Sequence, residues 1–178
     1  MKKIVFIFLA CVLLVSTSCI DKTAMAELEV FKSKQEVEEQ NKIIVQRYWE
    51  GKWNERHPEV LDELQTPDVV YHGSSMEMNG IEEYKQVYNS YLLAIHDTRL
   101  EINKLIAEGD LVMSNIKLRG IHKGELEGLL PTGNEINISL FTIFRLVDGK
   151  IAEEWEIIDQ LGMMTQLGME LQMKEVKE

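Results

Sequence analysis

The hydrophobic pattern of the 178-residue chain changes period near its middle, and this change limits the folds open to it. Four segments of the second half alternate apolar and polar residues as β-strands do: 100–106, 111–117, 136–147 and 151–158. Three turn sequences separate the four segments: Glu108-Gly109-Asp110, Pro131-Thr132-Gly133-Asn134 and Asp148-Gly149. Consecutive strands joined by short turns pair with one another, so the second half predicts an antiparallel meander.

The first half has helical spacing instead. Apolar residues recur every three or four positions in three segments, which predicts helices over 35–53, 58–65 and 81–95. A short strand is expected at 69–71, and a further helix in the methionine-rich tail at 161–173. Helices followed by antiparallel strands indicate an α+β domain, with the helices packed on one face of the sheet.

The first twenty residues differ from the rest of the chain. Two lysines precede an apolar run from Ile4 to Val15, and small residues then lead to Cys19. This order is typical of a signal peptide, and the run is shorter than the roughly 20 residues of a membrane-spanning helix. We therefore expect a signal peptide at 1–19, a tether at 20–34 and a folded domain at 35–173.

Cysteine usage indicates where the protein resides. Cys19 follows small residues and resembles the cleavage site of a bacterial lipoprotein, at which the cysteine becomes the lipidated N-terminus. Cys11, inside the apolar run, is the only other cysteine, so no disulfide is expected in the domain. The sequence favours an extracytoplasmic protein, lipid-anchored to a bacterial membrane. The alternative is a secreted or periplasmic soluble protein.

Charge and motifs argue against several function classes. The net charge of −11 disfavours nucleic acid as a partner and leaves the N-terminal lipid as the only expected link to a membrane. No glycine-rich phosphate loop follows a strand, and no Gly-x-Ser-x-Gly motif is present. The four histidines lack the spacing of metal ligands, so we expect no metal. Because the phosphate-binding motif is missing too, we expect no cofactor.

The last strand carries the most suggestive residues. Alternation places Glu154 and Glu156 on one face and Ile151, Trp155 and Ile157 on the other. Residues two positions apart on a strand are about 7 Å from each other. If both carboxyls are buried at this distance, one of them stays protonated at neutral pH and can act as a general acid. The other interpretation is that both carboxylates are solvated on an exposed face.

Three short motifs follow one another in the second half. Residues 120–133 contain Gly-x-His-x-Gly and Pro-Thr-Gly, 144–155 contain a hairpin turn of Asp-Gly-Lys-Ile, and Leu-Gly recurs in 159–162 and 166–168. In this order they resemble the SnoaL-like polyketide cyclase family and its ester-cyclase-like members. The similarity spans about Gln40 to Gly168.

This resemblance implies a nuclear-transport-factor-two-like fold, in which a cone of helices is closed by a curved antiparallel sheet around a pocket. It also implies aldol ring closure of a polyketide ester without metal or cofactor, with an aspartate of the last strand as acid/base. Glu156 matches that aspartate, and Glu154 lies two positions before it. Thr142 and Tyr71 match pocket positions of the cyclases, and His72 resembles a histidine common in the ester-cyclase-like relatives.

The candidate site follows from these observations. The proposed catalytic residues are Glu156, Glu154 and His72. The proposed pocket residues are Trp49, Tyr71, Tyr88, His122, Leu140, Thr142, Phe144 and Ile158. For His122 the alternative is a structural role in a turn, and for Trp49 it is the hydrophobic core.

Two function classes stay open. In the first, the domain is a cofactor-independent enzyme of the cyclase or isomerase type. Glu156 would remove a proton next to the carbonyl of a small apolar compound, and His72 or Tyr71 would stabilise the enolate. In the second, the domain binds a ligand or mediates association at the bacterial envelope without catalysis. In either class we expect a homodimer, because the outer face with Trp155 and Ile157 needs cover and relatives dimerise through that surface.

Overall fold

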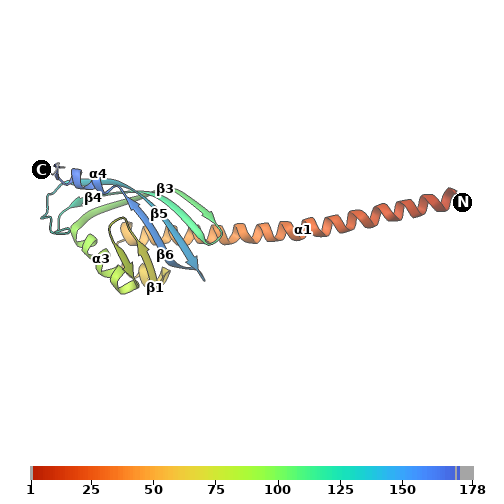
Figure 1. Cartoon of the computed structure of the whole chain (residues 1–178), viewed down its shortest axis with the longest axis horizontal. Coiled ribbons are helices and arrows are strands. Elements are labelled where there is room, and N and C mark those ends of the chain that lie inside the picture. Colours follow the sequence, from red (N-terminus) through yellow and green to blue (C-terminus); the bar gives the residue numbers. More distant parts are fainter. Residues whose placement is uncertain (1, 171, 173–178) are drawn as a thin grey trace, which may run out of the picture. The chain divides into compact units, whose positions relative to one another are not determined.

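The computed structural model describes residues 2–170 and 172, with side chains described from Lys22 onward. The chain divides into two compact units, Met1–Val37 and Glu38–Glu178. Residues 2–37 of the first unit belong to α1 (Lys2–Trp49), so the expected tether is part of this helix (Figure 1). Within the described residues, no helix combines the length and apolarity needed to cross a membrane.

The second unit contains the sheet and the remaining helices. The C-terminal part of α1 leads into the π-helical turn η1 (Glu50–Asn54). Three α-helices follow: α2 Val60–Leu64, α3 Ile81–Ala94 and α4 Gln160–Gln166. The strands are β1 Gln65–His72, β2 Glu77–Asn79, β3 Ile95–Glu108, β4 Leu111–His122, β5 Glu135–Val147 and β6 Lys150–Ile158. The order of helices and strands expected from the sequence is confirmed, apart from the short strand β2, which was not expected.

All six strands form one sheet in the order β2-β1-β6-β5-β4-β3. Strands β3 to β6 pair antiparallel with their sequence neighbours, which confirms the predicted meander. Strand β1 pairs parallel with β6, so the sheet is mixed rather than purely antiparallel. This pairing aligns Tyr71 with Glu154. The long strands run side by side in Figure 1.

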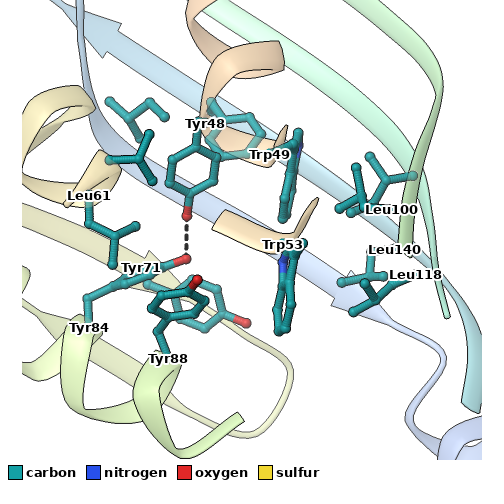
Figure 2. Packing of buried hydrophobic residues seen from close by; sticks show 14 of the residues in the cluster. Tyr48, Trp49, Trp53, Leu61, Tyr71, Tyr84, Tyr88, Leu100, Leu118 and Leu140 are labelled. Atoms are coloured by element: carbon teal, nitrogen blue, oxygen red, sulfur yellow. Dashed lines mark hydrogen bonds between the residues drawn. The ribbon is translucent and has the colours of Figure 1, made fainter. Parts of the chain in front are cut away.

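The core lies between the sheet and the end of α1. Tyr48, Trp49 and Phe144 are fully buried and meet edge to face, with ring centroids 5.3–5.7 Å apart. Edge-to-face pairs add to the free energy gained by burying the rings. Figure 2 shows Tyr48, Trp49 and Trp53 following one another along α1 and η1 toward the tyrosines of α3.

A β-bulge in β6 overturns part of the predicted alternation. Arg145 pairs with Glu153 but Leu146 pairs with Ile151, so Ala152 has no partner across the strand. An unpaired residue reverses the phase of the alternation. Ile151 is therefore fully buried on the same side as Glu154, and the prediction that it lies on the outer face is wrong.

Other differences concern the ends of elements. The segment Thr66-Pro67-Asp68, which separates the predicted helix 58–65 from the predicted strand 69–71, lies inside β1, where the register with β6 shifts between Gln65 and Val70. Proline is accommodated because the ladder is interrupted there. Helix α4 ends at Gln166, and the far end of the expected tail helix lies outside the described residues.

Candidate functional site

A cavity of about 100 Å³ lies between α3, η1 and the inner face of the sheet. Most of its lining is aromatic or aliphatic. Five of the predicted site residues lie in this lining: Tyr71, Tyr88, Leu140, Glu156 and Ile158. The predicted stripe on α3 also reaches it, because Tyr84 and Tyr91 line it together with Tyr88. The space is of the same order as a cavity of roughly 150 Å³ that holds benzene, so it suits a compound of about six heavy atoms.

Glu156 is held at the cavity by two hydroxyl groups. The Tyr71 hydroxyl donates to Oε1 at 2.9 Å, and Thr142 Oγ1 donates to Oε2 at 3.2 Å. Thr142 is the residue directly opposite Glu156 on β5, so the antiparallel register explains the second bond. Thr142 itself is fully buried and contacts Glu156 without lining the cavity.

Tyr71 reaches Glu156 from β1. A Cβ atom at position 73 would lie 2.8 Å from the Tyr71 ring. Gly73 has no Cβ, so the ring can occupy this position without a clash. Burial, and secondly the charge of Glu156, raise the pKa of the Tyr71 hydroxyl well above its usual range. The phenol therefore stays a hydrogen-bond donor over the whole physiological pH range.

Glu154 lies deeper than Glu156 and is fully buried. The hydroxyls of Tyr48 and Tyr84 both donate to Oε2, at 3.1 and 3.0 Å, and these two hydroxyls lie 2.5 Å from each other (Figure 2). Oε1 has no hydrogen-bond partner among the described residues. Burial raises the pKa of the Glu154 carboxyl to about 7; Lys52 lowers it and Glu156 raises it further. Glu154 is thus the carboxyl that holds a proton near neutral pH.

Lys52 completes this group and was missed by the sequence analysis. Its ammonium nitrogen donates to the hydroxyls of Tyr84 at 2.6 Å and Tyr48 at 3.1 Å. Five aromatic rings surround the nitrogen with centroids 4.9–5.8 Å away. A signal was present in the sequence: Val45, Tyr48, Trp49 and Lys52 occupy one helical stripe, so the lysine stands at a buried position.

The turn that carries Lys52 is fixed from several sides. The Tyr88 hydroxyl donates to the backbone carbonyl of Lys52. Asn54 donates to the carbonyl of Leu100 at 3.1 Å and accepts from its amide at 2.7 Å. These bonds attach η1 to α3 and β3, so the Lys52 side chain is held toward the tyrosines.

His72 does not reach the cavity, contrary to the prediction. Strand alternation places Tyr71 on the inner face of β1 and His72 on the outer face. There the imidazole stacks on Trp155, with ring centroids 5.4 Å apart, and its Nε2 lies 3.0 Å from a Glu153 carboxylate oxygen. Of the two donors considered for the enolate, only Tyr71 is in place.

Three further predicted pocket residues lie outside the cavity lining. Trp49 and Phe144 belong to the core described above, where Trp49 at the end of α1 packs against Phe144 of β5. His122 is fully buried at the end of β4, where Nδ1 accepts from the Thr132 amide at 3.3 Å. This bond fixes the turn after β4, in agreement with the structural alternative. Across the described residues, no group of three or more His, Cys, Asp or Glu side chains could hold a metal ion.

The pH dependence of stability should show the buried state of Glu154. Folding raises the pKa of this carboxyl from 4.5 to about 7, so the folded state binds the proton more tightly than the unfolded state. The stability that the protonated Glu154 carboxyl contributes is fully present below pH 4.5 and is lost as the pH rises to 7. We expect Glu154→Gln to remove a decline on the order of 3 kcal/mol in the free energy of unfolding across this window.

Urea denaturation at a series of pH values measures this decline. Because all other titratable groups are common to both proteins, the comparison is the difference between the wild type and Glu154→Gln, with Glu101→Gln on an exposed position of β3 as control. Parallel curves for the wild type and Glu154→Gln would show that the carboxyl is not held in its neutral form.

Together, a curved mixed sheet, helices on its inner face and a cavity between them define an α+β protein of the nuclear-transport-factor-two-like class. The family within this class follows from comparison with known sequences. The model of the SnoaL-like polyketide cyclase family matches residues 43–167, and the chain belongs to this family. The resemblance seen in the sequence is thereby confirmed.

Individual relatives are similar over most of their length. The aklanonic acid methyl ester cyclase DauD of Streptomyces sp. (strain C5) is 29% identical over 126 residues, which are 70% of this chain and 77% of DauD. The structure of a SnoaL-like protein from Jannaschia sp. CCS1 matches with a TM-score of 0.69 and 25% identity, over 74% of this chain and 93% of that one.

A more distant structure shows the fold alone. It is a protein with a ketosteroid isomerase-like fold from Catenulispora acidiphila, solved in complex with trimethylamine. Its TM-score is 0.61 and its identity 20%, over 71% of this chain and 93% of that one.

Proposed function

We propose that the cavity binds a small apolar carbonyl compound and that Glu156 removes a proton from the carbon next to the carbonyl. The observation that carries this proposal is a carboxylate at an apolar cavity, held by one phenol and one alcohol donor. Two hydroxyl donors occupy one lone pair on each oxygen, so each oxygen keeps a second lone pair for the substrate proton.

Tyr71 supplies the second group that the reaction needs. An enolate forms readily only where a hydrogen-bond donor meets the developing negative charge on oxygen. Tyr71 lines the same cavity as Glu156, and its raised pKa keeps its proton in place. Because a phenol has one proton, the hydroxyl would turn from Glu156 Oε1 to the substrate oxygen when the substrate binds. The reaction class is cofactor-independent proton transfer at carbon, as an isomerase or an aldol-type cyclase uses it.

Exchange of α-protons for deuterium tests this proposal without a known substrate. Small ketones such as cyclopentanone are incubated with the wild-type protein in deuterated buffer, and the loss of the α-proton signal is followed by NMR. We expect exchange above the buffer rate for at least one ketone that the cavity admits. Exchange at the buffer rate for the whole panel would leave the carboxylate a binding group.

We propose that the protein forms a homodimer through the outer face of β5 and β6. Phe141, Ile143, Trp155 and Ile157 are exposed there, with Ile157 at 69%, and together they form an apolar patch. Apolar patches of this kind favour association. We expect Ile157→Asp to shift the protein from dimer to monomer in light scattering. The control Leu93→Asp, at an exposed position of α3, should leave the dimer intact. A wild-type monomer at micromolar concentration would contradict the proposal.

We also propose that Cys19 carries a lipid that anchors the protein to a bacterial membrane. Support comes from the sequence alone, since the side chain of Cys19 lies outside the described residues. Cys19→Ala is expected to move the protein from the membrane fraction to the soluble fraction. If the variant fractionates with membranes as the wild type does, the lipoprotein hypothesis is wrong.

A further inference from the structure

Lys52 is a buried amine that the proposed proton transfer does not use. Its residue exposure is 6%, and it is among the residues that line the cavity. Lysine is almost never buried unless a carboxylate pairs with it. Here none of the described Asp or Glu side chains forms an ion pair with it, and its hydrogen-bond partners are the two phenols of Tyr48 and Tyr84.

We infer that Lys52 is a nucleophilic amine that forms an imine with the carbonyl compound bound in the cavity. This inference rests on the proposed function, because it takes the same ligand class. It adds a covalent step through a residue other than Glu156. The juxtaposition that carries it is an amine, two phenols and the buried carboxyl Glu154, linked in one hydrogen-bonded group at the cavity.

The nucleophile has to be the neutral amine. Burial lowers the pKa of the Lys52 ammonium group, while the nearby charges of Glu154 and Glu156 raise it in part. Removal of an amine from water is the usual means by which proteins prepare a lysine for imine formation. The absence of an ion-pair partner among the described side chains leaves this effect of burial dominant.

The atoms balance within the group that the structure brings together. The neutral nitrogen of Lys52 attacks the carbonyl carbon, a proton passes from nitrogen to oxygen, and a carbinolamine results. In the protonated form of Glu154, the Oε2–H group donates to the Tyr84 hydroxyl in place of the reverse bond, and this hydroxyl passes its own proton to that oxygen as it takes the one from Glu154. The carbon–oxygen bond breaks and one water leaves. The products are an iminium on Lys52 and a Glu154 carboxylate, and no oxidant or reductant is consumed.

The surroundings of Lys52 suit the cationic product. The iminium carries its positive charge at the nitrogen that the five aromatic rings already surround. Cation–π attraction and the Glu154 carboxylate left by the reaction both stabilise it. An iminium also makes the neighbouring C–H bonds more acidic, so Glu156 at the same cavity would abstract the proton more easily.

Reductive trapping tests this inference on the folded wild-type protein. Cyclopentanone is added with sodium borohydride, which reduces an iminium to a stable secondary amine. The protein should gain the mass of the ketone less one oxygen atom, and peptide mapping should place the label on Lys52. We expect Lys52 to be labelled at least tenfold faster than Lys104, an exposed lysine of β3.

Two variants assign the label to the amine. Lys52→Arg keeps a positive charge on a side chain of similar length but cannot form the imine, so this variant should lose the fast label. The control Lys104→Arg should be labelled as fast as the wild type. Should Lys52→Arg fail to fold, peptide mapping of the wild type decides alone. Labelling of Lys52 no faster than Lys104 in folded protein would overturn the inference.

The outcome is distinguishable from failure of the proposed function. Ketone α-proton exchange that depends on Glu156 while Lys52 stays unlabelled would overturn the imine and leave the proton transfer standing. Fast labelling of Lys52 without exchange would support the imine and contradict Glu156 as the base.

Discussion

Replacement of Trp49 by alanine is expected to lower the free energy of unfolding by about 3–5 kcal/mol, the usual cost of removing a large aromatic side chain from a core. Trp49 is fully buried, meets Tyr48 and Phe144 edge to face, and donates from its indole nitrogen to Ser114 Oγ at 3.1 Å. The substitution therefore leaves a cavity and also removes the donor that Ser114 accepts from.

Urea denaturation measures this loss, with Leu93→Ala on α3 as the control. Leu93 is 73% exposed, so its truncation should change the free energy of unfolding by no more than about 0.5 kcal/mol. The comparison also separates two interpretations of Trp49. A loss below about 1 kcal/mol with weakened ketone binding would place Trp49 in the pocket wall and contradict its role in the core.

The arrangement of elements was predictable because it depends on local pattern. Alternation and turn residues predicted β3 to β6, and helical spacing predicted the end of α1 and α3. The three-residue strand β2 and the parallel pairing of β1 with β6 were not predictable, because neither leaves a periodic signal in a stretch so short.

The candidate site was predicted only in part. Glu156 and Tyr71 reach the cavity as expected. His72 does not, because it is adjacent to Tyr71 on a strand and adjacent residues face opposite sides. Ile151 was misplaced because a bulge changes the phase of β6 without a sequence signal such as glycine. Lys52 escaped notice because a charged residue on an apolar stripe is usually solvated.

Replacement of Glu156 by glutamine is expected to slow α-proton exchange by roughly 10²- to 10⁴-fold, the contribution of one general acid/base group. Glutamine keeps the size of the side chain, and its amide oxygen can still accept a hydrogen bond from Tyr71 or Thr142. The fold should therefore be retained, with an unchanged far-ultraviolet circular dichroism spectrum. What the variant lacks is the basic oxygen that takes the substrate proton.

The decisive measurement is the rate of deuterium incorporation into cyclopentanone by the wild type, Glu156→Gln and Glu153→Gln under identical conditions. Glu153 is a matched control on the same strand, where it pairs with Arg145 at 2.7 Å and with His72 away from the cavity. The proposed mechanism predicts wild-type exchange above the buffer rate, a rate close to wild type for Glu153→Gln, and a loss of at least 100-fold for Glu156→Gln. Equal rates for the wild type and Glu156→Gln would contradict general base catalysis by Glu156.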